Sequence, residues 1–365
     1  MGIAQNKNAA MADGESKTKQ KEQTPFFKPM APQPGDKVLW IRLSAFGDVL
    51  QAGASAQRFK MKYPDVRVTF LTKPVFADLI RNQPYIDEVI AWDVKKKPLD
   101  FFKVVRTVRA SNFKWLFSMH RVLSVAAVAL FSRIRQRFGY NRTIQFCYRQ
   151  THWESLDYLG VDFMRRDSVA IFTTEEDRNR ANQMLSGLPE KKIFAIIGAS
   201  KEKKLWPTEH WITFLSRLAE QGWGIILNGN GASEEGMALE IENAISKPCV
   251  LNLVGHTTFP LLAAVARAST VAIGNDTGPL HLAALVGTPT MGFFGVTDAY
   301  VMDLRMPWFR DIRVSCPKAG CWNYVCPLDC LSGISPKRAL SEFHDFAARI
   351  RRPEEASAGS ITHGL

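Results

Sequence analysis

The feature that most constrains the fold is a regular alternation of short apolar runs with longer amphipathic runs. In the first half of the chain, the expected strands and the helices between them cover 37–43, 49–62, 66–71, 75–82, 88–92, 99–109 and 115–118. Strands that alternate with helices in this way form parallel sheets with helices on both faces. The sequence therefore predicts the α/β class, with a doubly wound sheet.

The same alternation restarts after the turn at 187–190, which indicates a second domain. Thr258 is expected to cap a helix that carries Pro260 in its first turn, and Gly287 is expected to end the helix at 280–286. A chain of 365 residues is long enough for two such domains. The strands expected in this half are 193–197, 224–228, 250–254, 270–274 and 290–294.

The expected boundaries divide the chain into four segments, of which the two domains are joined near 175–190. The N-terminal segment lacks the apolar core of a signal peptide, and no apolar run approaches the ~20 residues of a spanning helix. We therefore expect a cytoplasmic protein. The segments are a disordered polar tail at 1–34, an N-terminal domain at 35–180, a C-terminal domain at 190–350 and a flexible tail at 351–365.

Two turns that contain Gly and Asp follow expected strands, one in each domain. The first turn, 42–48, follows the apolar run 38–41, and the second, 274–281, follows 270–273. Ligands bind at such places in open α/β sheets, because loops at the carboxyl ends of strands meet helix N-termini there. The pair of turns predicts a cleft with reactive groups on both walls.

The second turn has the composition of an anion site. Asp276 or Thr277 can cap the following helix, and Pro279 presets its backbone. The free N–H groups near Thr277 and Gly278 would then bind an anion. His281 lies four residues after Thr277 and shares the helix face nearest that site. The alternative is an ordinary capped helix with a core-facing histidine.

Two further loops follow strands and belong to the same sheet edge. In 199–207 a lysine can offset diphosphate charge and Ser200 can donate to a phosphate oxygen, unless the lysines simply face solvent. In 229–234 an acid after a glycine turn can accept hydrogen bonds from a ribose diol. Neither a G-x-G-x-x-G fingerprint nor a Walker A sequence occurs, so a nucleotide would be held by another arrangement.

The first turn carries a carboxylate that is suited to proton transfer. Gly47 lets the chain bend beneath Asp48, whose carboxylate is expected to project into the cleft and face the phosphate site. A helix start favours the ionised form of this group. Asp48 is therefore a candidate general base for a hydroxyl nucleophile. The alternative is an acidic residue that merely occupies the first turn of a helix.

The chain is basic, with 47 Lys and Arg against 35 Asp and Glu, and the excess is concentrated in one stretch. Between residues 95 and 149 there are thirteen Lys or Arg and one acid, Asp100. This stretch is either a solvated surface or a patch for a phosphorylated partner, such as a lipid head group or an anionic membrane. No nucleic-acid-binding signature accompanies it, so we expect no nucleic-acid partner.

Four of the six cysteines lie close together in sequence, at 316, 321, 326 and 330. The resulting C-x4-C-x4-C-x3-C spacing fits no standard zinc or ferredoxin pattern. Thiols of a cytosolic protein are expected to be mostly reduced. A metal site is one alternative, and a loop whose thiols simply pack is the favoured one.

The segment I-R-L-S-A-F-G-D-V-L-Q-A at 41–52 resembles the opening of glycosyltransferase family 9, whose best-known members are the ADP-heptose:lipopolysaccharide heptosyltransferases. K-L-W-P-T-E-H-W at 204–211, G-N-D-T-G-P-L-H-L-A-A at 274–284 and G-T-P-T-M-G-F-F-G-V-T-D at 287–298 are similar to its later motifs. The resemblance covers about residues 37–350. It implies a GT-B fold, in which two Rossmann-like domains face each other across a cleft, with the acceptor on the N-terminal side and the nucleotide sugar on the C-terminal side.

The resemblance also implies roles for single residues. Asp48 matches the family's proposed catalytic base, Lys204 the lysine at the donor diphosphate, and Glu234 or its neighbour Glu235 the acid near the nucleoside. The implied donor-binding residues are Ser200, Lys204, Glu234, Asp276, Thr277, Gly278 and His281. The expected acceptor-binding residues are Ser44 and Gly47 from the first turn, and Arg133, Arg135 and Arg137 from the basic stretch.

We therefore expect an inverting glycosyltransferase that moves a heptose or related sugar from an ADP-sugar to a hydroxyl of the lipopolysaccharide inner core or a similar surface glycan. The expected partners are the nucleotide-sugar donor, a phosphorylated glycolipid acceptor and the anionic inner leaflet, to which the protein would attach peripherally. No cofactor or divalent metal is expected to be essential. The alternatives are a sugar-nucleotide epimerase of the same fold and a non-catalytic protein that binds anions or nucleic acid.

Overall fold

The computed structural model describes residues 29–93, 99–120, 122–139, 150–162, 167–245, 248–300, 302, 304–349 and 353. The predictions for 1–28 and 354–365 lie outside the described residues. So do six of the basic residues in the stretch 95–149, which are Lys95, Lys96, Lys97, Arg121, Arg142 and Arg149.

The described strands of the N-terminal domain form one parallel sheet in the order β3-β2-β1-β4-β5-β6. Ile41 at the end of β1 is in register with Leu71 of β2 and Ser118 of β4. This register brings the segments that follow these three strands to one edge of the sheet. The strands are β1 Lys37–Ile41, β2 Arg67–Thr72, β3 Glu88–Ala91, β4 Trp115–Ser118, β5 Gln136–Gly139 and β6 Gln150–Thr151.

The described strands of the C-terminal domain repeat this arrangement, in the order β12-β11-β10-β7-β8-β9. In the N-terminal sheet the direction of winding reverses between β1 and β4, and in the C-terminal sheet it reverses between β7 and β10. Ligands of doubly wound folds bind at such switch points. The strands are β7 Lys192–Ile196, β8 Gly224–Asn228, β9 Val250–Asn252, β10 Val271–Asn275, β11 Thr290–Phe294 and β12 Phe309–Arg313.

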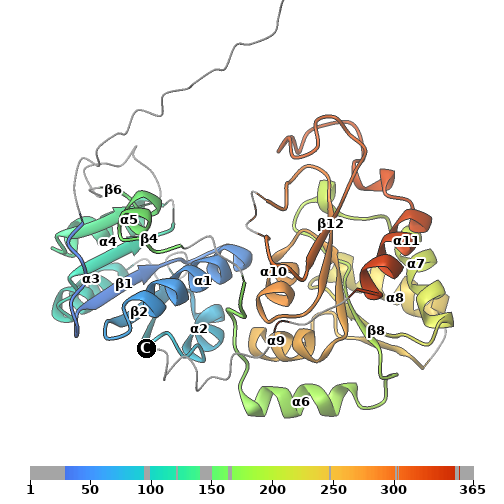
Figure 1. Ribbon diagram of the computed structural model, residues 1–365, viewed down its shortest axis with the longest axis horizontal. Helices are drawn as coiled ribbons and strands as arrows, with labels where there is room; N and C mark the ends of the chain where they lie inside the picture. Colours follow the sequence, from blue (N-terminus) through green and yellow to red (C-terminus); the bar gives the residue numbers. More distant parts are fainter. Residues whose placement is uncertain are drawn as a thin grey trace, which may run out of the picture.

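Helices cover both faces of each sheet (Figure 1). On the N-terminal sheet, one face carries α1 Phe46–Lys62, α2 Pro74–Arg81 and α5 His152–Tyr158, and the other carries α3 Asp100–Ala110 and α4 Leu123–Phe131. On the C-terminal sheet, one face carries α7 Thr208–Glu220, α8 Ala232–Ile245 and α11 Pro336–Ala347, and the other carries α9 Phe259–Ala268 and α10 Gly278–Leu285, with α6 Glu175–Leu185 packed on α9. Two short 3-10 helices, Glu202–Lys204 and Leu331–Gly333, lie in loops.

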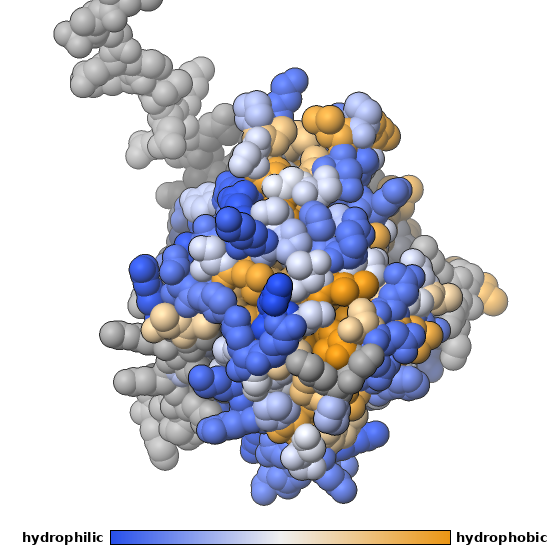
Figure 2. Space-filling view, turned by 90° about the vertical axis from the view of Figure 1, so that its right-hand side faces the viewer, coloured by the Kyte–Doolittle hydropathy of each residue, from blue (hydrophilic) through white to orange (hydrophobic). Residues whose placement is uncertain are grey.

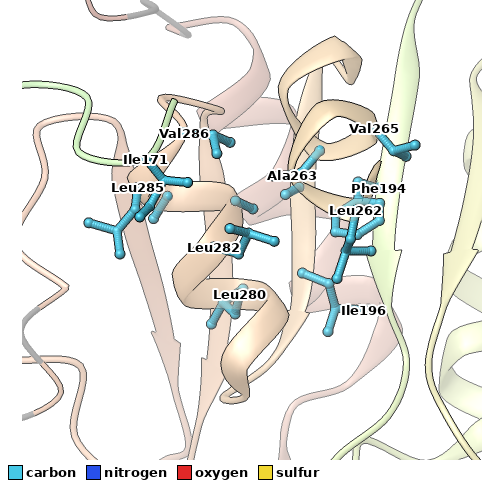
Figure 3. Close-up of a cluster of buried hydrophobic side chains, with 14 of the residues drawn as sticks. Ile171, Phe194, Ile196, Leu262, Ala263, Val265, Leu280, Leu282, Leu285 and Val286 are labelled. Atoms are coloured by element: carbon cyan, nitrogen blue, oxygen red, sulfur yellow. The ribbon is translucent and has the colours of Figure 1, made fainter. Parts of the chain in front are cut away.

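The two domains meet through an apolar junction. Helix α1 packs against α10 and α2 against α9, and Figure 1 shows α1 and α10 facing each other. The ring of Phe46, at the start of α1, lies 4.0 Å from that of Phe259 and 5.6 Å from that of Phe76. Beneath this contact, Leu280 and Leu282 of α10 belong to the buried cluster drawn in Figure 3. The junction fixes how the two sheet edges face each other.

The predicted α/β class with two doubly wound sheets is confirmed, and most elements agree closely with expectation. Strands β8 and β11 span the predicted residues, Thr258 caps α9 by accepting from the N–H of Leu261, and Gly287 follows α10 with a φ of 84°. Helix α1 starts at Phe46, earlier than the predicted Val49, because the Asp48 carboxylate accepts the N–H of Ala45 at 3.1 Å. The expected joining region holds α6, which packs with the C-terminal domain.

The surface of the C-terminal domain that faces away from the junction is mostly hydrophilic, with smaller apolar patches (Figure 2). Among the described helices, none combines the length and the apolar character needed to cross a bilayer.

Candidate functional site

A cavity of about 670 Å³ lies where the switch points of the two sheets face each other. The N-terminal wall includes the turn before and into α1 and Val75 of α2, and the C-terminal wall includes the loops after β7, β8, β9 and β10 and the start of α9. A cavity that needs both domains matches the cleft predicted from the two turns. Its polar lining includes Asp48, Ser200, Lys204, Asn228, Asn230, Glu234, Thr257, Asp276, Thr277 and His281.

Asp48 projects from the first turn of α1 into this cavity, as predicted. Its carboxylate forms an ion pair with the guanidinium of Arg42, which also donates to the carbonyl of Met119 beyond β4. The Asp48 side chain remains 46% exposed in spite of this pairing. Arg42 thus orients the carboxylate and leaves it accessible to a bound hydroxyl.

His120, which the sequence analysis did not single out, lies beside this pair. It follows β4 at the same switch point, and the N–H of the preceding Met119 bonds to the carbonyl of Ile41 at 3.0 Å. Burial, followed by the positive charge of Arg42, lowers the pKa of His120 to about 4, against the opposing effect of Asp48. Its Nδ1 is buried and makes no hydrogen bond within the described part of the chain. The signal that could have found it is its place directly after the strand next to β1.

Asp276 is the centre of the opposite wall. Its side chain is 1% exposed, and its Oδ2 accepts from Nζ of Lys204 at 2.6 Å while Oδ1 lies 3.4 Å from Nε2 of His281. Burial by itself would raise the pKa of Asp276. The hydrogen bond and charge of His281 and the charge of Lys204 outweigh burial and hold this pKa well below its usual range. The carboxylate is therefore ionised at any physiological pH.

The lysines of loop 199–207 have different surroundings. Lys204 is largely buried beside Asp276 and lines the cavity, as does Ser200. Lys203 instead donates to the carbonyl of Leu328 at 3.2 Å and is absent from the lining. The loop therefore places one ammonium group, that of Lys204, at the cavity wall.

Helix α10 begins at the cavity and presents its free amides there. Thr277 occupies the N-cap position, one of the two positions predicted, but its side chain makes no capping hydrogen bond. Asp276 is held by Lys204, and Oγ1 of Thr277 is buried without a hydrogen bond to any described residue. A Cβ on Gly278 would lie 2.5 Å from Phe46, so glycine is what lets α1 approach this helix start. An anion in the cavity could accept hydrogen bonds from the free N–H groups at this helix start and from Lys204.

Glu234, rather than Glu235, faces the cavity. Its Oε2 accepts the N–H of Asn230 at 2.5 Å, and the carboxylate lies so close to the backbone of Gly198 that an added Cβ would be 2.0 Å away. Glu235 points instead toward Gly255 and is absent from the lining. Of the two acids between which the sequence left a choice, Glu234 is the one that lines the cavity.

Of the N-terminal residues predicted to bind the acceptor, some line the cavity and others do not. Gly47 lines the cavity and lies against the ring of His281, whereas Ser44 is absent from the lining. Arg133, Arg135 and Arg137 are not brought to the cavity either. They lie before and at the start of β5, and it is the carboxyl end of the sheet, not its amino end, that faces the cavity.

The four clustered cysteines lie away from this cavity. All are free thiols, and burial followed by the nearby thiols raises the pKa of Cys330. Within the described ranges, no group of three or more His, Cys, Asp or Glu is arranged to hold a metal ion.

Comparisons with known proteins agree with this architecture. The family model for glycosyltransferase family 9 (heptosyltransferase) matches residues 101–331. Lipopolysaccharide heptosyltransferase 1 of Campylobacter coli is 25% identical over 301 residues, which cover 72% of this chain and 85% of the relative.

Solved structures share the fold. The E. coli ADP-heptose lipopolysaccharide heptosyltransferase II is 18% identical with a TM-score of 0.71, and the match covers 86% of this chain and 99% of that one. A family 9 glycosyl transferase from Veillonella parvula is 17% identical with a TM-score of 0.73, over 88% of this chain and 99% of that one. These likenesses confirm the predicted GT-B arrangement of two domains.

Replacement of His120 with Asn is expected to change how stability depends on pH. An unfolded histidine binds its proton near pH 6.5, whereas folded His120 does so near pH 4. Between these values the unfolded state holds more protons, so the contribution of His120 to stability is present above pH 6.5 and falls as pH falls toward 4. Melting temperatures measured from pH 7.5 to 4.5 should therefore decline less steeply in the His120→Asn variant than in the wild type. The matched control is His256→Asn, at an exposed histidine, and parallel wild-type and His120→Asn curves would contradict the expectation.

Proposed function

Because this chain belongs to glycosyltransferase family 9, we propose that it transfers a heptose or related sugar from an ADP-sugar to a hydroxyl of the lipopolysaccharide inner core or a similar glycan. The observation that carries the proposal is one cavity with an accessible carboxylate, Asp48, on one wall and an anion site at Lys204 and α10 on the other. Relatives named as lipopolysaccharide heptosyltransferases support the choice of sugar and acceptor.

In the proposed reaction, Asp48 accepts the proton of the acceptor hydroxyl as its oxygen attacks the anomeric carbon. The bond from that carbon to the diphosphate oxygen breaks, and attack from the face opposite this bond inverts the anomeric configuration. The leaving diphosphate gains negative charge, which the ammonium of Lys204 and the amides at the start of α10 stabilise. This assignment requires no cofactor or divalent metal.

The position of Glu234 suits the nucleoside end of the donor. Its carboxylate lies beside Gly198 and Asn230, at the loops after β7 and β8, on the same domain as the anion site. A carboxylate at this place can accept hydrogen bonds from a ribose diol, as acids do in other Rossmann-like folds. The donor would then extend from Glu234 to Lys204, with its anomeric carbon toward Asp48.

Replacement of Asp48 with Asn should lower kcat by about 10²–10⁴-fold, because the amide cannot accept the proton. Turnover would be measured with ADP-heptose and a lipopolysaccharide core acceptor. Asp78→Asn, at an exposed residue of α2, serves as the control and should leave kcat unchanged. Unchanged turnover in Asp48→Asn would remove the base assignment. Formation of an epimerised sugar from donor alone would favour an epimerase instead.

Lys204→Met should lower kcat by about 10²–10³-fold, as expected for one lost stabiliser of developing charge. Lys203→Met is the matched control, since it removes the same charge from the same loop at a residue outside the cavity. Equal losses in the two variants would show that general loop charge, rather than the position of Lys204, matters.

Glu234→Gln should weaken ADP binding about tenfold or more in calorimetry, because a charged acceptor of hydrogen bonds is lost. Glu235→Gln provides the comparison, as the same change at the neighbouring residue, which does not line the cavity. If both variants bound ADP as tightly as the wild type, the nucleoside would have to lie elsewhere.

A further inference from the structure

The outer sides of helices α3 and α4 expose large apolar side chains. Leu99, Phe102 and Leu123 are 82%, 73% and 77% exposed, and Leu130 and Phe131 are exposed as well. We refer to these five residues as the α3–α4 face. Large apolar patches on soluble proteins mark surfaces that meet another molecule.

These side chains form one surface because both helices cover the same face of the N-terminal sheet. Val105 of α3 and Val125 of α4 are buried toward the sheet, so the opposite sides of both helices face solvent. The helices also touch, with the rings of Phe101 and Phe131 6.2 Å apart and Arg109 donating to the carbonyl of Phe131 at 2.6 Å. Figure 1 shows α3 on the side of the sheet away from the C-terminal domain.

The composition of α4 differs from that of an ordinary surface helix. Its sequence, LSVAAVALF, contains no charged residue. A helix with one solvent-facing side normally carries polar residues there. Leu123, Leu130 and Phe131 are spaced seven and eight residues apart and therefore fall on the same exposed side. The outer side of α4 thus has the character of a surface that becomes buried.

The charges around this face are positive. Lys103, Arg106 and Arg109 are exposed on α3, and Arg133 is exposed directly after α4. Asp100 is the single acid between residues 99 and 139. Apolar side chains flanked by Lys and Arg match the interface of an anionic bilayer, where apolar groups enter the acyl boundary and cations meet lipid phosphates. An RNA or an acidic protein would satisfy the charges but not the exposed leucines.

We propose that the α3–α4 face is a membrane-docking surface for bilayers that contain anionic phospholipid. This inference deepens the proposed function, whose acceptor is a lipid, although docking itself needs neither donor nor acceptor. Leu123 follows His120 by three residues, so the docking surface starts close to Arg42 and Asp48. A lipid-anchored acceptor could then enter the cavity from the bilayer on which the protein rests.

The test measures flotation of the full-length protein with vesicles, in the absence of nucleotide sugar and acceptor. The wild type should bind vesicles of phosphatidylcholine with phosphatidylglycerol, and bind vesicles of phosphatidylcholine alone much more weakly. Added salt should weaken the binding, because the cations contribute through screened charge. A double variant, Leu123→Ser with Phe131→Ser, should lose about tenfold or more in vesicle affinity.

The matched control is Leu239→Ser, which removes an apolar side chain of similar exposure, 55%, from α8 of the other domain and should bind vesicles like the wild type. Melting temperatures of all variants establish that they fold. An Arg106→Glu variant tests the charge without changing an apolar residue and should also bind more weakly.

Equal vesicle binding by the wild type and the Leu123/Phe131 double variant would overturn the proposal. So would equal binding to neutral and anionic vesicles, or a dimer in sedimentation that the double variant abolishes, since the face would then join two copies of the chain. Failure of the transferase proposal gives a different result. In that case the wild type would not turn over ADP-heptose but would still bind vesicles.

Discussion

The buried ion pair between Asp276 and Lys204 is the interaction around which the C-terminal wall of the cavity is organised. A carboxylate that is 1% exposed has to be paired, and removal of one partner from such a pair costs about 3–5 kcal/mol. Asp276 follows β10 and Lys204 belongs to the loop after β7, so the pair ties together the segments on both sides of the switch point. The same contact holds the ammonium group beside the free amides of α10.

The other carboxylate oxygen of Asp276 links this ion pair to the N-terminal domain. It faces His281, whose Nδ1 lies 3.1 Å from the side-chain amide of Gln51 on α1. Asp48 precedes Gln51 by less than one turn of that helix, and Gly278 allows the close contact with Phe46 at its start. The cavity wall at Asp276, the domain junction and helix α1, which carries Asp48, are thus connected by contacts between side chains.

Much of the fold could be predicted from the sequence, because parallel sheets covered by helices require apolar strands and amphipathic helices in strict alternation. Strands β4, β8 and β11 are found at their predicted residues. The errors concern residues whose position depends on partners distant in the sequence. Arg133, Arg135 and Arg137 were assigned by charge alone, which does not say at which end of β5 they lie. His120 was missed because its neighbours Arg42 and Asp48 come from the turn after β1 and from the start of α1, far away in the sequence.

Local patterning dictates strands, turns and helix starts. The amino-acid order is therefore enough to predict two doubly wound domains, the two turns that contain Gly and Asp, and the residue types that proton transfer and phosphate binding need. Which side chains meet depends on the three-dimensional packing of the two domains. This packing buried Asp276 against Lys204, turned Glu234 and not Glu235 toward the cavity, and left the apolar side of α4 in solvent. The physical reason is that burial and pairing depend on how two sheets face each other, and that arrangement follows from the packing of α1 and α2 on α10 and α9.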